Sequence, residues 1–359
     1  MPVSVLICDD SNLARKQMAR TLPPYWDVEI TFAANGAEGV DAIKAGKGSI
    51  VFLDLNMPVM DGYQVLDTIQ KEQLNALVIV VSGDIQATAL QRVTEFGALA
   101  FIKKPVTSAE IKQILLDYGI VDKDEFKIAE TLFHSRKEAQ ERQSELIESI
   151  PESLPSLSND LDLAPEFRDA LQEVANVAMG KTADLLARLL DVFVLLPVPN
   201  VNIFEASELT MALSAASEYK TISTVCQGFI CSGISGEALL LFHDSSFKDM
   251  AKLMGIEQQD RNFQEKEILM DTANILISAF LQAFSQQLNV SFSQGHPSVL
   301  GQHSTVKEMI NANNLRKQKT IAIEIHYRIE HHDVQCDLLL LFTENSLPSL
   351  INSLSYLIE

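Results

Sequence analysis

Positive charge is scarce in this sequence of 359 residues, in which 28 Lys and Arg stand against 48 Asp and Glu, giving a formal net charge of -20. Proteins that bind DNA or RNA depend chiefly on Lys and Arg to neutralise phosphates. The charge balance therefore argues against a nucleic-acid partner and a DNA-binding output.

Cysteine is also scarce, with four residues in the whole chain, most of them inside apolar strand-like runs. This placement favours buried thiols over a disulfide framework or a zinc site. The four positions are Cys8, Cys226, Cys231 and Cys336.

Long apolar runs are missing as well. No run approaches the roughly 18 to 20 residues that cross a bilayer, and the start MPVSVLICDD has no basic leader. We expect a cytoplasmic protein without membrane insertion. The length favours two domains with a connection: residues 1–120, a helical connector and linker at 121–160, and residues 161–359.

The first part of the chain alternates short apolar segments with helical stretches. This rhythm predicts a doubly wound α/β domain with five parallel strands, each followed by a helix. The five strand-like segments are residues 4–8, 28–33, 49–55, 76–82 and 98–102.

Polar residues follow the ends of these predicted strands. Asp9 and Asp10 follow the first strand, Asp54 lies at the third, Ser82 ends the fourth, and Lys104 follows the fifth. In a parallel sheet the carboxyl ends of the strands meet at one edge, so we expect one pocket. Three carboxylates there would repel one another without a hard cation, and the cluster therefore predicts Mg²⁺.

The segments ICDD, FLDLNMPVMDG, VVSG and FIKKP resemble the receiver family of two-component signalling over residues 1 to 120. The resemblance implies a flavodoxin-like (βα)5 fold and phosphorylation by a sensor histidine kinase similar to CheA. It implies these roles: Asp54 accepts the phosphoryl group, Asp9, Asp10, Asp54 and the Asn56 carbonyl bind Mg²⁺, Ser82 and Lys104 contact the phosphoryl group, and Phe101 is the aromatic switch residue.

Four of the residues that follow Asp54 in the sequence are interpreted as loop and turn residues instead of catalytic groups: Met57, Pro58, Asp61 and Gly62. Gly62 suits backbone angles that other residues avoid.

The connector, residues 122–150, is charged and lacks Gly and Pro, and this composition predicts a long helix. Its apolar residues recur at intervals of three and four positions, but polar residues interrupt this pattern in the middle. This pattern leaves open a homodimer through a weak coiled coil or a single solvated helix. Residues 151–165 are punctuated by Pro and Ser and predict a linker.

The C-terminal part contains an internal duplication. Asp169, Glu173, Asn176 and Pro199 recur as Glu267, Asp271, Asn274 and Pro297, at a constant offset of 98 (267 − 169, and likewise for the others). The segments EALLLFHD and DLLLLFTE also correspond. A pseudo-two-fold α/β domain is therefore expected.

In each copy an acidic residue and an Asn lie three positions apart in a helical context, so both side chains can contact the same partner. Asn is a poor helix-interior residue because its amide competes for backbone groups, and its recurrence suggests a chemical role. The alternative is a solvated helix face or an internal amide hydrogen bond.

This spacing resembles the CheC/CheX/FliY family of chemotaxis phosphatases. The first copy fits completely, and the second departs at Asp271 and Glu267. The resemblance implies two active-site helices that act on phosphorylated CheY-like receivers, with Glu173, Asn176, Asp271 and Asn274 as catalytic residues.

The chemistry suits these residue types. An amide both donates and accepts without titrating, so Asn176 and Asn274 can position the water that attacks an aspartyl phosphate. Glu173 and Asp271 can pair with the receiver's lysine. We expect the first site to be the better catalyst, since Asp271 is shorter. Alternatively, the domain binds receivers without catalysis and the receiver is a phosphate sink. Whether Asp54 regulates this domain or is its substrate stays open.

Overall fold

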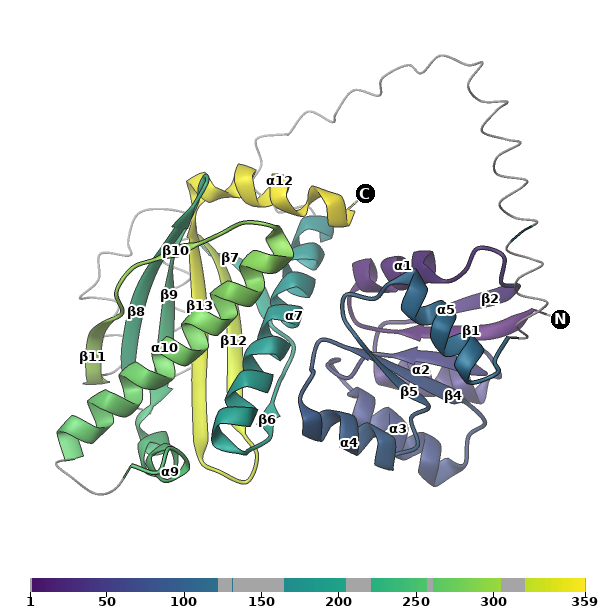
Figure 1. Cartoon of the computed structure of the whole chain (residues 1–359), viewed down its shortest axis with the longest axis horizontal. Helices are drawn as coiled ribbons and strands as arrows, with labels where there is room; N and C mark the ends of the chain where they lie inside the picture. Colours follow the sequence, from purple (N-terminus) through teal and green to yellow (C-terminus); the bar gives the residue numbers. More distant parts are fainter. Residues whose placement is uncertain are drawn as a thin grey trace, which may run out of the picture.

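The computed structural model describes residues 2–121, 131, 165–204, 221–256, 261–304 and 320–358. Figure 1 shows two α/β units, each built on one sheet, with helix α7 of the C-terminal unit facing the N-terminal unit. The predicted connector helix and most of the linker fall outside the described residues.

The N-terminal unit contains one sheet of five parallel strands in the order β2-β1-β3-β4-β5. This is the strand order of the flavodoxin-like class, and it confirms the predicted doubly wound fold. The strands are β1 Val3–Cys8, β2 Val28–Ala33, β3 Ile50–Leu53, β4 Leu77–Ser82 and β5 Ala100–Lys103.

Five helices connect and cover these strands: α1 Asn12–Thr21, α2 Gly36–Lys44, α3 Gly62–Glu72, α4 Ala87–Glu95 and α5 Ser108–Asp117. Their starts follow local chemistry. Asp61 and Thr107 close capping boxes at α3 and α5, so backbone N–H groups at those helix starts have side-chain acceptors. The sheet is buried on both faces because separate apolar clusters lie above and below it.

Gly62 differs from its sequence interpretation. Its backbone does not lie in the left-handed region; instead, a Cβ there would overlap the carbonyl oxygen of Asp54 and lie 2.8 Å from the Cα of Leu55. Glycine is needed for close approach of α3 to the end of β3. The end of β3, at Asp54 and Leu55, is thereby packed directly against the start of this helix.

The C-terminal unit contains an eight-stranded sheet whose main path is β10-β8-β9-β13-β12-β6. Strand β11 pairs with β8, and β7 pairs with β12. The strands are β6 Val194–Leu195, β7 Asn200–Phe204, β8 Ile222–Cys231, β9 Ile234–His243, β10 Ser293–Gln294, β11 Ser298–Ser304, β12 Thr320–Ile329 and β13 Val334–Thr343.

The strand pairing shows the expected pseudo-two-fold symmetry. Each copy supplies a hairpin, β8–β9 or β12–β13, and the two hairpins meet where β9 pairs with β13. The short strands after α7 pair with the second hairpin, whereas those after α10 pair with the first. The two copies therefore share one sheet and one core.

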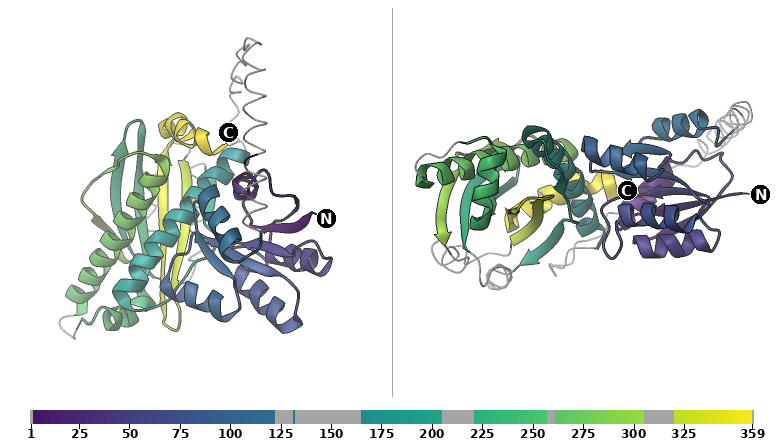
Figure 2. Two further views of the ribbon diagram at one scale, coloured as in Figure 1. Left: turned by 45° about the vertical axis from the view of Figure 1, so that its right-hand side comes forward. Right: turned by 90° about the horizontal axis from the view of Figure 1, so that it is seen from below.

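The C-terminal helices are α7 Pro165–Leu190, α9 Phe247–Leu253, α10 Arg261–Leu288 and α12 Leu347–Ile358. The long helices α7 and α10 lie side by side across one face of the sheet (Figures 1 and 2). In the left view of Figure 2, α7 lies between this sheet and the N-terminal unit.

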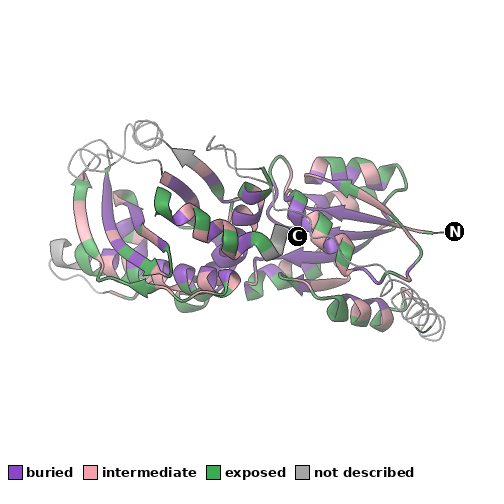
Figure 3. Ribbon diagram, turned by 90° about the horizontal axis from the view of Figure 1, so that it is seen from above, coloured by how far each residue is buried: buried purple, intermediate pink, exposed green. Residues whose placement is uncertain are grey.

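Figure 3 shows buried residues concentrated in the strands and along the long helices. By length and composition, Glu265–Leu288 of α10 could cross a membrane, but 56% of its most apolar window is buried inside the protein. Its apolar face packs into the core that it shares with α7 and the sheet. Burial in a shared core accounts for the apolar composition of α10.

Candidate functional site

The N-terminal strand ends bring three carboxylates together. Asp9 and Asp10 follow β1, Asp54 follows β3, and one ligand atom from each lies within 4.8 Å of the others. Asp54 is 1% exposed. The edge predicted from the sequence is therefore formed.

Lys104 is the buried cation of this cluster. Its Nζ lies 2.8 Å from Asp9 Oδ2, 3.7 Å from Asp54 Oδ1 and 3.2 Å from Glu173 Oε1. Glu173 belongs to α7 of the C-terminal unit. One ammonium thus joins both halves of the chain.

Burial and mutual repulsion set the titration of these groups. Burial raises the pKa of Asp54 well above its ordinary value, although Lys104 opposes the change. Burial, reinforced by Asp9, raises the pKa of Asp10 to about 7. Burial disfavours the charged form of Lys104, but Asp54, Asp9 and Glu173 outweigh it and raise its pKa.

The cluster fits a divalent cation. Among the described residues, neither carboxylate oxygen of Asp54 has a hydrogen-bond partner, although both are buried. A buried carboxylate without partners is costly unless a cation joins it, and Mg²⁺ prefers such oxygen ligands. Asp9, Asp10 and Asp54 supply them, and Asn56 is buried beside the same strand end.

Ser82 and Phe101 are also near the predicted edge. Ser82 ends β4, is fully buried, and its Oγ accepts a hydrogen bond from the N–H of Asp84. Phe101 lies in β5, half-buried against the core cluster beneath α2, α3 and α4. Neither position conflicts with the predicted roles.

Helix α7 presents a row of residues to the N-terminal unit. Asp169, Glu173, Asn176 and Gly180 are spaced by four, three and four positions, which places them along one helix face. Each of the four meets the N-terminal unit. We refer to these four residues as the α7 row.

Asp169 of the α7 row contacts the start of α1, which follows Asp9 and Asp10 in the chain. Asp169 Oδ2 accepts a hydrogen bond of 2.6 Å from the N–H of Leu13, in the first turn of α1. A carboxylate there satisfies a free helix N–H and complements the helix dipole. The Leu13 side chain packs into the C-terminal core.

Asn176 lies against the loop after β4. A Cβ built on Gly83 would be 3.2 Å from the Asn176 carbonyl oxygen, so the two backbones are close. The Asn176 side chain is buried, and its Oδ1 has no hydrogen-bond partner among the described residues. An unpaired buried acceptor is costly, which favours a donor such as water at this position.

A cavity of about 360 Å³ lies at the junction of the two units. Its lining includes Asp9, Asp54 and Lys104 from one unit, with Glu173 and Val177 from the other. The carboxylates of Asp54 and Glu173 therefore face a common space.

A second group of contacts joins the units beyond the α7 row. The Gln86 side-chain amide donates to the Val194 carbonyl (2.8 Å) and accepts from its N–H (2.9 Å). Arg92 of α4 forms two hydrogen bonds with Glu330, and its guanidinium lies 3.9 Å from the centre of the Phe193 ring.

The sequence does not predict these contacts. Gln86 directly precedes helix α4, and Arg92 lies within it. Neither residue type is unusual there, and no spacing links them to residues more than a hundred positions away. Only the folded chain brings the partners together.

The second copy is arranged differently. Glu267, Asp271 and Asn274 repeat the spacing on α10, but all three are exposed. The structure therefore brings Glu173 and Asn176 to the N-terminal unit at Lys104 and Gly83 and leaves Asp271 and Asn274 facing solvent.

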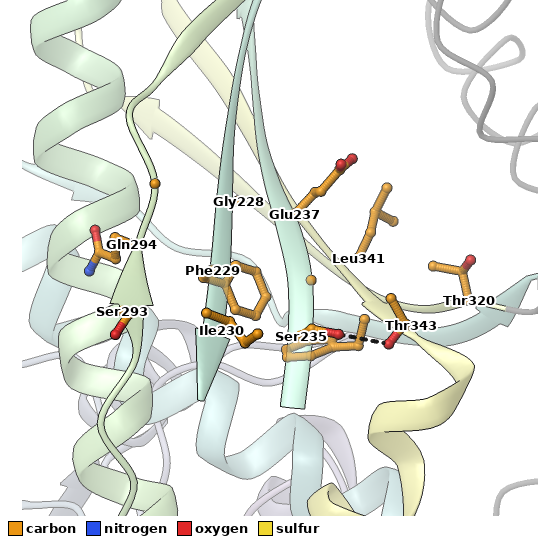
Figure 4. Close-up of a pocket in the computed structure, with 13 residues that line it drawn as sticks. Gly228, Phe229, Ile230, Ser235, Glu237, Ser293, Gln294, Thr320, Leu341 and Thr343 are labelled. Carbon is orange, nitrogen blue, oxygen red and sulfur yellow. Dashed lines mark hydrogen bonds between the residues drawn. The ribbon is translucent and has the colours of Figure 1, made fainter. Parts of the chain in front are cut away.

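Another cavity, of about 800 Å³, lies at the strand ends of the C-terminal sheet (Figure 4). Its described lining comes from β8, β9, β10, β12 and β13 and the residue after β10, with Glu237 as its charged side chain and a Ser235–Thr343 hydrogen bond of 3.1 Å. The acid of this lining, Glu237 of β9, and its amide, Gln294 of β10, lie on different strands, unlike the pair on α7.

Comparison with known proteins places the N-terminal unit. Residues 5–116 match the family model for the response regulator receiver domain. A protein-glutamate methylesterase/protein-glutamine glutaminase of Geobacter sulfurreducens is 35% identical over 118 residues, which cover 32% of this chain and 32% of that protein. The chain thus spans about a third of the length of such curated relatives.

Solved structures include chains that are similar to parts of this one. Thermotoga maritima FliY is 15% identical, with a TM-score of 0.43, over 54% of this chain and 98% of that chain. A chain from the CheX-CheY-BeF3-Mg complex of Borrelia burgdorferi is 33% identical, with a TM-score of 0.32, over 34% of this chain and 92% of that chain.

Proposed function

We propose that this chain is a response regulator whose N-terminal receiver domain is joined to a phosphatase domain that hydrolyses the aspartyl phosphate of receiver domains. Its own Asp54 is the first substrate, and other phosphorylated CheY-like receivers are further ones. The domains are residues 1–120 and 161–359, joined by the connector at 121–160.

The carrying observation is the buried ion pair between Glu173 and Lys104. It places the acid of the α7 motif 3.2 Å from the ammonium that also contacts Asp54. Both side chains are nearly inaccessible, so solvent screens their attraction little. This pair holds α7 at the edge where a phosphoryl group on Asp54 would lie.

The proposed reaction is in-line hydrolysis. A water oxygen forms the new bond to phosphorus while the bond to the Asp54 carboxylate oxygen breaks. Asp54 leaves as a carboxylate, and both water protons leave with phosphate as dihydrogen phosphate before exchange with solvent. Asn176 positions the water, because its buried, unpartnered Oδ1 can accept one of the water protons in a hydrogen bond.

The receiver residues hold the phosphoryl group. When bound, Mg²⁺ neutralises charge on phosphoryl oxygens, and Asp9, Asp10, Asp54 and the Asn56 carbonyl would hold it. Ser82 donates a hydrogen bond to a phosphoryl oxygen, and Lys104 pairs with another. Phe101 is assigned the aromatic switch position.

Decay of the Asp54 phosphate in the intact chain tests this function. The Asn176→Ala variant should lose phosphate at least about tenfold more slowly, equivalent to about 1.4 kcal/mol of barrier. Asn274→Ala should slow decay less, because Asn274 is exposed and away from Asp54. Asn352→Ala, on the exposed side of α12, is the matched control.

Equal decay in wild type and in Asn176→Ala would reject the enzyme and leave the alternative, a binding domain with the receiver as a phosphate sink. A larger loss for Asn274→Ala than for Asn176→Ala would reverse the assignment of the better site.

Mixing intact chains separates action within one chain from action between chains. A phosphorylated chain with Asn176→Ala and Asn274→Ala is combined with a chain carrying Asp54→Ala. Faster phosphate loss than without the second chain indicates action on a separate receiver. Unchanged loss restricts the activity to the chain's own Asp54.

The proposed partners are a sensor histidine kinase similar to CheA, which phosphorylates Asp54, and phosphorylated CheY-like receivers in chemotaxis signalling. We place the protein in the cytoplasm, where such kinases present their phosphohistidine.

A further inference from the structure

The internal repeat extends one residue beyond the acid and amide. Gly180 completes the α7 row, and its counterpart in α10 is Ser278, at the same offset of 98 (278 − 180). The two copies therefore agree in chemistry at the acid and the amide but differ in size at the fourth position.

Gly180 is the point of closest approach between α7 and the receiver. A Cβ at this position would overlap the carbonyl oxygen and carbon of Gly83 and lie 2.9 Å from the amide nitrogen of Asp84. All of these are backbone atoms, which cannot rotate away like the end of a flexible side chain. A side chain of any size at position 180 is thus incompatible with the docked arrangement.

The receiver contributes the other half of this contact. Gly83 directly follows Ser82, the hydroxyl residue of the receiver site, and a Cβ there would lie 3.2 Å from the Asn176 carbonyl oxygen and 3.3 Å from the Val177 Cα. These distances are tight but not impossible. A small shift of the receiver would relieve them, at the expense of the contacts around Glu173.

Helix α10 cannot make the same contact. Ser278 has a Cβ, and its Oγ donates a hydrogen bond of 3.1 Å to Gln294 Oε1 within its own domain. If a receiver approached α10 as this chain's own receiver approaches α7, the Cβ of Ser278 would overlap the backbone of that receiver. This agrees with the exposure of Asp271 and Asn274.

We propose that the contact between Gly180 and Gly83 is the specificity determinant of the phosphatase site. Helix α7 engages best those receivers that have glycine after the active-site hydroxyl residue, this chain's own receiver among them, because a Cβ there would crowd the backbone of Asn176 and Val177; α10 engages none in this geometry. This inference rests on the proposed function, since it names the receivers that the α7 site accepts.

The test compares three variants of the intact chain: Gly180→Ala, Gly83→Ala and the control Gly228→Ala. Gly228 lies in β8, and a Cβ there meets nothing within 4 Å. Gly180→Ala should not endanger folding, because alanine favours a helix over glycine by about 0.5 to 1 kcal/mol. Circular dichroism checks that each variant is folded.

Two measurements are made on each variant: small-angle X-ray scattering, which reports docking, and the decay of the Asp54 phosphate. Gly180→Ala should enlarge the radius of gyration and slow decay at least tenfold. Gly83→Ala should show the same changes to a smaller degree, and Gly228→Ala should match wild type.

A folded Gly180→Ala chain that stays docked and hydrolyses phosphate at the wild-type rate would overturn the inference. So would a larger effect from Gly83→Ala than from Gly180→Ala. Failure of the proposed function is distinguishable: in that case Asn176→Ala decays like wild type, while scattering still shows whether Gly180→Ala undocks.

Discussion

At the scale of single residues, the site is dominated by one buried ammonium among several carboxylates. Lys104 pairs with Asp9 in its own domain and with Glu173 in the other. When Glu173 is neutralised, Lys104 keeps Asp9 and Asp54 as partners inside its own domain. The change therefore removes only the ionic contact of Lys104 that joins the two domains.

The first prediction concerns Glu173→Gln, which keeps the size of the side chain and removes its charge. Charge-assisted hydrogen bonds contribute about 1.5 to 3 kcal/mol, so phosphate decay at Asp54 should slow by about tenfold or more. Phosphate release from the phosphorylated chain measures this. Glu166→Gln, an exposed change in the first turn of the same helix, should leave the rate unchanged.

A second residue-scale prediction concerns a cross-strand pair outside the site. His326 of β12 lies opposite Asp337 of β13, with 2.7 Å between His326 Nδ1 and Asp337 Oδ1. The hydrogen bond to Asp337 raises the pKa of His326. Burial opposes ionisation of Asp337, but hydrogen bonds from His243 and His326 outweigh it and lower its pKa to about 2.

The raised pKa of His326 makes the stability of the fold depend on pH. Because the folded pKa of His326 is raised, its contribution to stability is complete below the ordinary value near 6.5 and is lost as pH rises through the raised pKa. The midpoint temperature of thermal unfolding should therefore fall as pH rises from about 6.5 through the raised pKa of His326. His326→Gln should flatten this dependence; an unchanged slope would show that other groups cause it.

At the scale of elements, the two long helices share a repeat but differ in packing. The middle of α7 consists largely of small residues. It is buried on nearly every side, because the sheet covers one face and the receiver the other. Helix α10 instead fills the core with aromatic rings. Phe284 stacks on Phe280 at 5.6 Å between ring centres and also contacts Phe292 and Phe342.

The third prediction follows from this packing. Phe284 is 0% exposed, so Phe284→Ala should lower the free energy of unfolding of the C-terminal domain by about 3 to 5 kcal/mol. Denaturant unfolding followed by circular dichroism measures the loss. Phe32→Ala, which removes a half-exposed ring from β2, should have a small effect. Similar losses for both would contradict the assignment of α10 as the core helix.

At the scale of the whole molecule, the receiver docks on α7 through contacts on two sides of the motif. The α7 row meets the edge that holds Asp9, Asp10 and Asp54, and Arg92 with Gln86 meets the turn after β12 and the start of β6. The second group of contacts depends on the side chains of Gln86 and Arg92, which lie outside that edge.

The fourth prediction uses a charge exchange across this contact. Arg92→Glu should repel Glu330, enlarge the radius of gyration and slow phosphate decay by about five- to thirty-fold, equivalent to about 1 to 2 kcal/mol. The double variant Arg92→Glu with Glu330→Arg should recover much of both. Lys44→Glu reverses an exposed pair with Glu72 elsewhere on the receiver and serves as the control. Failure of the double variant to recover either property would show that the Arg92–Glu330 pair does not hold the units together.

The sequence by itself determined the receiver fold and the convergence of its polar residues. Alternating apolar segments specify strand and helix, and parallel strands bring Asp9, Asp54 and Lys104 to one edge in any such fold. The repeat at an offset of 98 likewise predicted a pseudo-two-fold domain, because equal local patterns form equal elements.

Only the tertiary structure decided which copy meets the receiver. Glu173 and Asp271 are nearly equivalent in chemistry, and both lie in helical contexts. The difference arises at Gly180, where the backbone of α7 touches the backbone of the receiver, and Ser278 has a side chain at the corresponding place. Such a contact depends on the distance between two surfaces far apart in sequence, and no local pattern encodes that distance.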